Sequence, residues 1–353
     1  MGENELPFPF EFEELQPEED ELIKTAFGSA MYANYIRLGP KGYMVFKPYK
    51  KEAANIYNMP LRPTDVFVAS YQRSGTTWVQ ELVWLIANDL NYEEAAEKPL
   101  TQRYPFLDLF MSFDENSKEE YIDTIAKTEE NFNTEKFSQL LAYLVTPVTP
   151  FLAAVPLTTK RFIKTHLPMS LLPPKLLDTA KMVYVARDPR DVAVSSYHHA
   201  KWMKTTNFQG NFKEFWNLFH RALFSLTPYF EHVKEAWEKR GDPNMLFLVY
   251  EDLSKDLPAS IRRVADFFGK QLNEEQMNRL CDHLSFESFK NNKSVNYEHL
   301  RELGILEKSE SMIRKGKTGG WRDYFDDEMA QQAEQWIEDN LRDTDLRFPH
   351  MKH

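Results

Sequence analysis

The residues best suited to chemistry stand in four short segments that combine basic, hydroxyl and glycine residues. The segment Tyr71–Trp78 reads Y-Q-R-S-G-T-T-W, and its arginine, glycine and hydroxyl groups are of the kinds that hold a phosphate. The sequence K-T-H-L-P at 164–168 sets a candidate cation two residues from a candidate base. The sequences R-D-P-R-D-V-A-V-S at 187–195 and I-R-K-G-K-T-G-G-W at 313–321 add further cations, hydroxyls and glycines.

Each segment also has an ordinary explanation. Ser and Thr are common caps at a helix start, Asp188 before Pro189 begins a helix well, and a basic run such as 314–317 is often a solvated loop. What favours a binding site is the combination of the segments. The chain carries a net charge of −11, yet its basic residues gather at each of them.

Apolar strands are predicted just before the first three segments. The predicted strands are 65–70, 161–165, 181–186 and 245–250. Helices are predicted from Ser74–Thr77 onward and at 190–203, 212–239, 257–268 and 327–340. This alternation predicts an α/β fold, a single domain over 1–353 with a central, mostly parallel β-sheet and helices on both faces. The carboxyl ends of parallel strands share one edge, so the segments should meet there.

Two regions depart from this alternation. Residues 1–22 are acidic, with Phe8, Phe10 and Phe12 in alternation, and predict an extended N-terminal arm. Residues 91–160 are charge-rich and then Pro-containing, and predict an irregular insertion that serves as a lid. Its apolar residues either cap an elongated apolar pocket or belong to the core; they are Phe106, Leu107, Leu109, Phe110, Met111, Leu140, Leu141, Tyr143, Leu144 and Phe151.

Composition excludes several classes of protein. The chain has 353 residues, 42% of them hydrophobic, enough for a sizeable core, and its negative charge argues against nucleic acid or membrane as a partner. The single cysteine, Cys281, allows no internal disulfide and fits a reducing compartment. We find no signal peptide and no apolar run near the roughly 18 residues of a membrane helix, so we predict a cytoplasmic protein. The nine histidines show no metal-ligand spacing, so no metal is expected.

The four segments, together and in this order, resemble those of the cytosolic sulfotransferase family. L-V-Y-E-D at 248–252 also matches, and the resemblance covers about residues 60–325. It implies the P-loop-like sulfotransferase fold, the co-substrate PAPS with PAP as product, and transfer of a sulfuryl group to the hydroxyl of a small hydrophobic alcohol or phenol. L-G-P-K-G-Y-M-V at 38–45 and the long insertion resemble the insect retinol dehydratase. That likeness implies an alternative, in which a sulfate ester of retinol is eliminated to give anhydroretinol.

The resemblance also implies roles for the residues that match the family's motifs. The phosphosulfate would be held by Arg73, Ser74, Gly75, Thr76 and Thr77. The ribose phosphate would be held by Arg187, Ser195, Arg314, Lys315 and Gly316. The adenine would be surrounded by Trp78, Tyr250 and Phe286, with Ser285 beside them. His166 would be the catalytic base, with Lys164 and Arg73 as catalytic cations.

The chain departs from the family's pattern at three places. Arg73 stands where the family usually has Lys, and a planar guanidinium is not equivalent to a mobile ammonium. Leu284 stands where a Thr usually helps to hold the adenine. The family's C-terminal dimer motif is missing after Trp321–Phe325, which predicts a monomer or a different dimer.

Two readings outside this family remain. A P-loop kinase or NTPase would bind nucleotide at the same kind of loop, but the G-x-x-x-x-G-K-[ST] pattern is missing at Tyr71–Trp78. A catalytically inactive nucleotide-binding protein would not need the lysine and histidine at 164 and 166.

Overall fold

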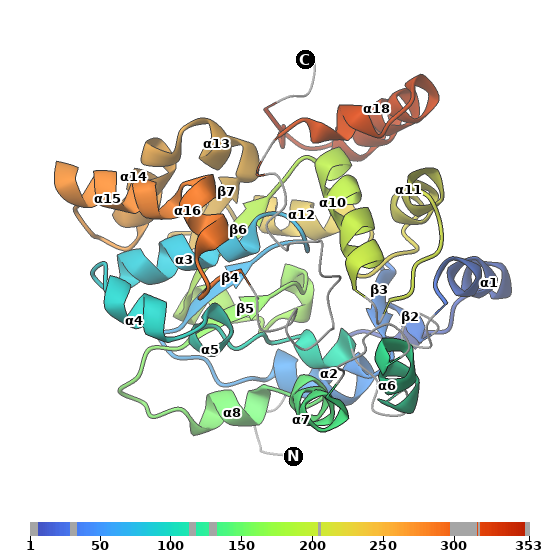
Figure 1. Cartoon of the computed structure of the whole chain (residues 1–353), viewed down its shortest axis with the longest axis horizontal. Helices are drawn as coiled ribbons and strands as arrows, with labels where there is room; N and C mark the ends of the chain where they lie inside the picture. The colour runs from blue at the N-terminus through green and yellow to red at the C-terminus, as the bar shows by residue number, and fades with distance from the viewer. Residues whose placement is uncertain are drawn as a thin grey trace.

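A four-stranded parallel sheet forms the centre of the molecule (Figure 1). The structure is a computed structural model, and it describes residues 6–28, 34–112, 118–126, 133–203, 206–296, 316 and 318–349. The strand order is β5-β4-β6-β7, and each neighbouring pair is parallel. The strands are β4 (Val66–Ala69), β5 (Phe162–Thr165), β6 (Lys181–Ala186) and β7 (Met245–Val249).

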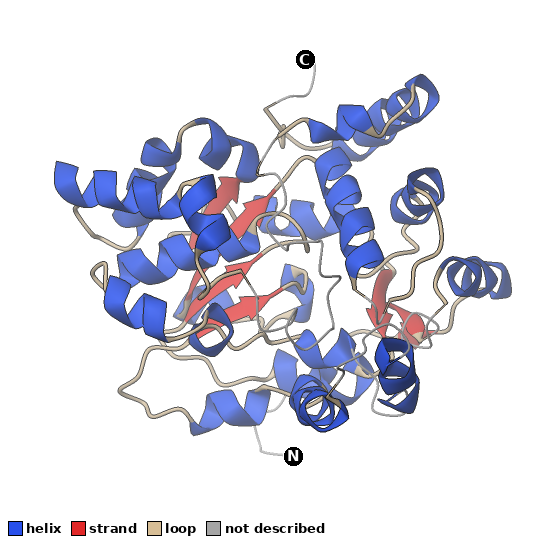
Figure 2. Ribbon diagram, viewed as in Figure 1, coloured by secondary structure: helices blue, strands red, loops and turns tan. Residues whose placement is uncertain are grey.

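Each face of this sheet carries its own hydrophobic core. Successive side chains of a strand point to opposite faces, so Val66 and Val68 join one core while Phe67 and Ala69 join the other. The first core is covered by α3 (Thr76–Ala87), α14 (Leu257–Phe267) and α15 (Glu274–Leu284). The second is covered by α10 (Pro189–Trp202), α12 (Tyr229–Glu238) and α18 (Asp327–Leu341). Figure 2 shows helices on both sides of the strands, and the predicted α/β fold is confirmed.

The N-terminal region adds a small antiparallel sheet. Its strands, in the order β1-β2-β3, are β1 (Phe12–Glu13), β2 (Tyr35–Leu38) and β3 (Tyr43–Phe46). The predicted extended arm is correct at β1 but wrong from Pro17, where α1 (Pro17–Ala26) begins. A proline in the first turn, followed by acidic residues, favours a helix start, and the prediction overlooked this signal. The helix α2 (Tyr49–Tyr57) follows the small sheet.

The prediction of irregular structure over 91–160 is wrong for the described part of that stretch. It contains α4 (Tyr92–Glu97), α5 (Leu100–Arg103), the 3-10 helix η1 (Leu109–Ser112), α6 (Lys118–Ala126), α7 (Thr134–Leu144) and α8 (Thr149–Ala154). The side chains of Asn91 and Asn133 cap α4 and α7 by accepting from backbone N–H groups. Charged residues lie on the outer faces of these short helices, which is why the stretch resembled a loop in sequence. Its role as a lid stays a prediction.

The predicted helix over 212–239 is two helices in the structure. The first is α11 (Phe212–His220), and α12 begins at Tyr229. Ala222 and Leu226 between them have positive φ angles, and Pro228 has no N–H to continue a helix. The remaining short elements are η3 (Met169–Leu171), α9 (Leu176–Thr179), α13 (Tyr250–Lys255), α16 (Phe286–Asn291) and η4 (Gly320–Asp323).

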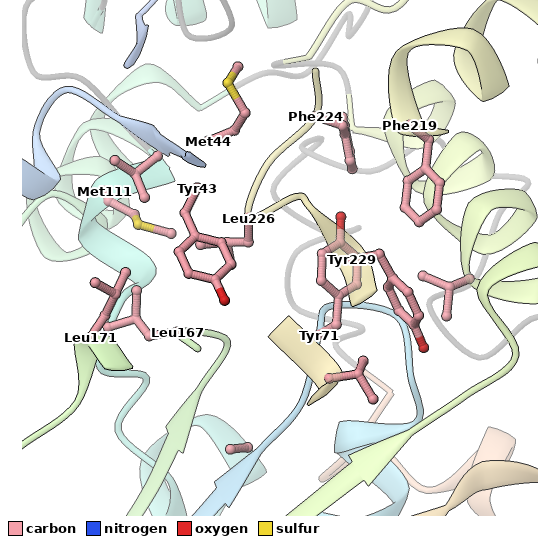
Figure 3. Close-up of a cluster of buried hydrophobic side chains, with 14 of the residues drawn as sticks. Tyr43, Met44, Tyr71, Met111, Leu167, Leu171, Phe219, Phe224, Leu226 and Tyr229 are labelled. Atoms are coloured by element: carbon pink, nitrogen blue, oxygen red, sulfur yellow. The ribbon is translucent and has the colours of Figure 1, made fainter. Parts of the chain in front are cut away.

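Buried aromatic residues fix the start of the segment that follows β4. The ring of Tyr71 packs edge-on against Tyr229 at 5.1 Å and against Phe219 at 6.0 Å, as Figure 3 shows. Its hydroxyl donates to the backbone carbonyl of Ser225 at 2.8 Å. The first residue of the candidate phosphate loop is therefore part of the core, so the loop begins from a fixed point.

Candidate functional site

A cavity of about 880 Å³ opens where the parallel strands end. Residues that follow each strand line it: the segment after β4, His166 after β5, Arg187 after β6 and Tyr250 after β7. We call this part, together with Ser195, Phe286 and Gly316, the loop end. The cavity continues to an apolar end, lined by Phe46, Leu109, Met111, Leu140, Tyr143, Leu144, Met203 and Leu226. In Figure 1, α16 at the loop end and α7 at the apolar end lie far apart.

The loop between β4 and α3 has the shape of an anion cradle. Gly75 has a φ of 97°, and a Cβ there would lie 2.5 Å from the Tyr250 ring, so only glycine fits. Ser74 is fully buried, and its hydroxyl has no hydrogen-bond partner among the residues that the structure describes. The first N–H groups of α3 have no partners within that helix. A phosphate group would supply partners for these donors.

Arg73 links the loop to the next strand and helix. It has a φ of 67°, which is uncommon for a residue other than glycine. Its Nε donates to the Ser195 hydroxyl at 3.2 Å, and its carbonyl accepts from Nη1 of Arg187, also at 3.2 Å. Two predicted cations and one predicted hydroxyl are therefore in direct contact.

The ring of His166 is held in one tautomer. Its Nδ1 lies 2.9 Å from the backbone carbonyl oxygen of Ser70, and a carbonyl can only accept, so Nδ1 carries the proton. Nε2 therefore has the free electron pair that a base needs. Burial lowers the pKa of His166 well below its usual range, and the Lys164 ammonium lowers it further. The ring is consequently neutral near pH 7.

A chain of hydroxyls connects this histidine to the loop. The Ser70 hydroxyl lies 2.6 Å from that of Thr76 and 3.3 Å from Nδ1 of His166. Thr76 and Thr77, both predicted to bind phosphate, line the cavity, and the Thr76 hydroxyl already has a partner in Ser70. The sequence analysis overlooked Ser70, although it ends the predicted strand directly before the loop.

Asp108 holds the backbone next to His166 and was not predicted. Its Oδ1 accepts from the His166 amide at 2.9 Å and from the Thr165 hydroxyl at 2.7 Å. The carbonyl of His166 accepts from Nε2 of His232 at 2.7 Å. Burial raises the pKa of the Asp108 carboxyl to about 6, and the two hydrogen bonds oppose that rise. The backbone of the candidate base is thus fixed on both sides.

Phe106 contacts both side chains predicted to be catalytic, Lys164 on β5 and His166 just after it. The Lys164 ammonium lies 4.1 Å from the centre of its ring, and the His166 ring stands edge-on at 5.1 Å. The backbone of Lys164 pairs with Pro105 and Leu107 at 3.0 and 2.8 Å. The segment 105–108 therefore runs beside β5 and orients both side chains.

The predicted adenine residues come together at the far side of the loop end. The Trp78 indole donates to the carbonyl of Leu284 at 2.9 Å and stands 5.8 Å from the Tyr250 ring. The guanidinium of Arg187 lies over the same tyrosine ring at 4.3 Å. Leu284 contributes its backbone oxygen, so this contact does not depend on the Leu284 side chain.

The remaining predicted nucleotide residues are described only in part. Gly316 has a φ of 61°, and a Cβ there would lie 2.4 Å from the Phe286 ring, so the two are in close contact. Ser285 caps α16 with its hydroxyl, which accepts from the Ser288 amide at 3.4 Å. Arg314 and Lys315 lie outside the described residues.

Asp191 joins the C-terminal segment to α10, and sequence reasoning did not single it out. Its carboxylate accepts from the Gly319 amide at 2.7 Å and from the Trp321 amide at 2.9 Å. The guanidinium of Arg190 lies over the Trp321 ring at 4.0 Å. These contacts hold Gly319 and Trp321 against α10. They therefore fix the position of the chain just after Gly316, which lines the loop end.

The apolar residues of the predicted insertion divide between cavity and core. Those that line the cavity are Phe106, Leu109, Met111, Leu140, Tyr143 and Leu144. Leu107, Phe110 and Leu141 are buried in the core without lining the cavity, Met111 and Leu144 belong to both groups, and Phe151 is exposed. Both expectations are therefore right for part of the set. No sequence pattern indicated the lining residues from other segments, which are Phe46, His199, Met203, Thr206, Ser225 and Leu226.

No cluster of three or more His, Cys, Asp or Glu side chains among the described residues could hold a metal ion. Among the helices described, none has both the length and the apolar character needed to cross a membrane.

The sequence matches a known family over most of its length. Residues 63–345 match the family described as "Sulfotransferase domain". The luciferin sulfotransferase of Photinus pyralis is 33% identical over 331 residues, which are 91% of this chain and 83% of that protein. Sulfotransferase 1E1 of Homo sapiens is 30% identical over 308 residues, which are 87% of this chain and 94% of that protein.

Solved structures of similar proteins share the fold. Two crystal structures of retinol dehydratase are 64% identical to this chain, cover 98% of it and 100% of their own chain, and superpose with a TM-score of 0.93. One is a complex with androsterone and the inactive cofactor PAP, the other a complex with retinol and PAP. A mouse sulfotransferase complexed with PAP is 21% identical, covers 86% of this chain and 93% of its own, and has a TM-score of 0.60, which indicates the same fold.

Proposed function

The chain belongs to the sulfotransferase family, and from this we propose that His166 serves it as the base in sulfuryl transfer to a small hydrophobic alcohol or phenol. One observation carries the proposal. The Nδ1 proton of His166 is held by Ser70, so Nε2 has its electron pair available in a cavity that also contains the side chains of Lys164 and Arg73. A base and two cations at one place are what transfer of an anionic group to a hydroxyl requires.

The co-substrate is PAPS, which supplies the sulfuryl group and leaves as PAP. The residues present suit such an anion: Ser74 is buried with an unpartnered hydroxyl, and Gly75 leaves room that a Cβ would fill. Thr77 and the start of α3 add donors for the phosphosulfate. Arg187 and Ser195 would hold the ribose phosphate, together with Arg314, Lys315 and Gly316. Trp78, Tyr250, Ser285 and Phe286 would enclose the adenine.

Each catalytic side chain has one task in this proposal. His166 takes the proton of the acceptor hydroxyl at Nε2 while the oxygen bonds to sulfur. Lys164 and Arg73 offset the negative charge that grows on the bridging and leaving oxygens. The same two cations lower the pKa of His166, and a bound polyanion offsets their effect.

The apolar end of the cavity suits the acceptor's hydrocarbon part. Leu109, Met111, Leu144 and Met203 are four of its lining residues, and burying apolar surface is favourable at about 25 cal/mol per Å². The hydroxyl would then point to His166. Relatives that are 64% identical were crystallised with retinol and with androsterone, which are acceptors of this class.

A second candidate function follows from the same likeness. Retinol dehydratase is 64% identical over nearly the whole chain, so the sulfate ester of an allylic alcohol is a candidate for elimination in this cavity. The carbon–oxygen bond would break with its electron pair leaving on sulfate, and loss of a C–H proton would form the new double bond. Both functions share the first step.

Mass analysis of products separates these functions. Purified protein with PAPS would be offered a simple phenol, a steroid, a catechol and retinol in parallel. We expect PAP with every accepted substrate, a sulfate ester from the phenol, and a hydrocarbon from retinol only if elimination follows. Use of ATP instead of PAPS, or PAP binding with no transfer to any acceptor, would contradict the proposal.

A further inference from the structure

One histidine of the cavity differs from the other histidines in its hydrogen bonding. In the part of the chain that the structure describes, the rings of His166, His198, His220, His232 and His283 each have a hydrogen-bond partner. None is found among the described residues for the ring of His199. That ring lines the cavity. The ring is partly buried and open to that cavity, so a polar group of a bound ligand can supply its hydrogen-bond partner.

The position of His199 is set by α10 and the turn after it. Asp191, Ser195, His199 and Met203 all line the cavity and follow one another at intervals of four residues. Such residues share one helix face, at steps of about 6 Å along the axis. Ser195 accepts from Arg73 at the loop end, and Met203 belongs to the apolar end. His199 therefore lies at the junction of the two ends.

The charge state of this ring limits what it can bind. Burial, together with the charges of Arg73 and Lys164, lowers the pKa of His199 to about 3. The ring is neutral at ordinary pH, with one N–H donor and one nitrogen acceptor. It consequently suits an uncharged oxygen, such as a hydroxyl or a carbonyl, rather than an anion.

If the function proposed above holds, the reacting hydroxyl is a poor hydrogen-bond partner for the His199 ring. That hydroxyl gives its proton to His166 and one electron pair to sulfur. A hydrogen bond donated to its other electron pair would hold back the attack. We therefore propose that His199 binds a second oxygen of the acceptor beside the reacting hydroxyl, so that catechols and similar vicinal compounds are preferred to matched phenols.

The test compares a 4-alkylcatechol with the phenol that has the same alkyl chain. Affinity for the PAP-loaded protein would be measured by calorimetry and kcat/KM with PAPS by steady-state kinetics, in wild type and in His199→Phe. His198→Phe is the matched control, because His198 neighbours it on α10 but bonds to the Tyr324 hydroxyl at 2.7 Å. His199→Gln keeps a donor and an acceptor and checks the role if the phenylalanine variant folds poorly.

We expect wild type to prefer the catechol about tenfold, the effect of one net hydrogen bond. His199→Phe should abolish that preference, while His198→Phe and His199→Gln should keep most of it, and PAP affinity should not change. Equal losses for the two acceptors, or an unchanged preference, would overturn the role of His199. A preference in binding that His199→Phe removes, without turnover of either compound, would uphold this inference while refuting the proposed function.

Discussion

Most of the loop end of the cavity is made of residues that directly follow strands, whereas the apolar end gathers side chains from distant segments. At the loop end, the segment 71–78, Arg187 and Tyr250 leave β4, β6 and β7 at one edge of the sheet. The apolar end takes residues from β3, η1, α7 and the turns after α10 and α11. Backbone geometry therefore shapes the first end, and side-chain volume shapes the second.

This difference has consequences for how each end tolerates change. At the loop end, Gly75 and Gly316 stand at positive φ with an aromatic ring in contact, so even one added carbon has nowhere to go. At the apolar end, a changed side chain alters the cavity's volume but leaves the backbone in place. Variants of the loop end should therefore impair every acceptor alike, and variants of the apolar end should alter the choice among acceptors.

The largest effect is expected at His166, in the loop end. Replacing His166 with Ala should lower kcat at least about a hundredfold for every acceptor, because it removes the base. PAP affinity should persist, because the ring contacts Ser70 rather than a predicted phosphate ligand. Steady-state kinetics with PAPS and calorimetry with PAP measure the two quantities. Unchanged turnover would refute the assigned base.

A second expectation tests the backbone control of the loop end. In Gly75→Ala, the new Cβ would meet the Tyr250 ring at 2.5 Å, and the residue would keep a φ that alanine rarely adopts. We expect PAP affinity to fall about a hundredfold, which is about 2.7 kcal/mol. Gly269→Ala is the matched control, since Gly269 also has a positive φ but nothing within 4 Å of its Cβ position. Similar PAP affinity in the two variants would show that the loop can adjust.

A smaller change in nucleotide affinity should distinguish the two phosphate sites proposed within the loop end. Arg187→Ala should weaken PAP binding about 10- to 100-fold, the range for one or two charge-assisted hydrogen bonds. Adenosine phosphosulfate lacks the ribose phosphate, so its affinity should change much less. Competition binding with the two nucleotides compares them directly. Equal losses for both would contradict the assignment of Arg187 to the ribose phosphate.

The sequence was informative about the loop end because most of its residues directly follow predicted strands. Four strands could be predicted from short apolar runs, and the residues just after them had to meet at one edge of the sheet. The segment 71–78 could thus be placed with Arg187 and Tyr250 before any distance was known. The hydrogen bonds of Ser70, Asp108 and Asp191 to His166 and Gly319 could not be predicted, because each joins residues far apart in sequence.

The apolar end was predicted less well for a physical reason. A buried leucine in the core and a leucine that lines a cavity have the same pattern in sequence, so Leu107 and Leu109 could not be told apart. Helices in 91–160 were missed because charged outer faces outweighed short apolar stripes. His199 stands beside His198 in sequence, and only the fold turns one toward the cavity and the other toward Tyr324.

The smallest expected effect concerns two buried carboxyls that both lie near the loop end. Burial raises the pKa of Asp108, which binds the His166 amide, to about 6 and that of Glu251, which binds the Asp188 amide, to about 7. Each folded-state pKa exceeds the unfolded value near 4, so the native state binds more protons between the two values. Each carboxyl therefore lowers the free energy of unfolding as pH rises through its window.

Replacing each carboxyl with an uncharged amide should reveal the two pH ranges separately. The Tm of Asp108→Asn relative to wild type should rise by about 2 to 5 °C between pH 4 and 6 and then level off. For Glu251→Gln the rise should continue to about pH 7. Calorimetric scans in matched buffers measure both differences, and the Asp108 variant keeps an oxygen for the His166 amide. A difference that is flat with pH would mean that the carboxyl is not protonated in the folded protein, because its hydrogen bonds then outweigh its burial.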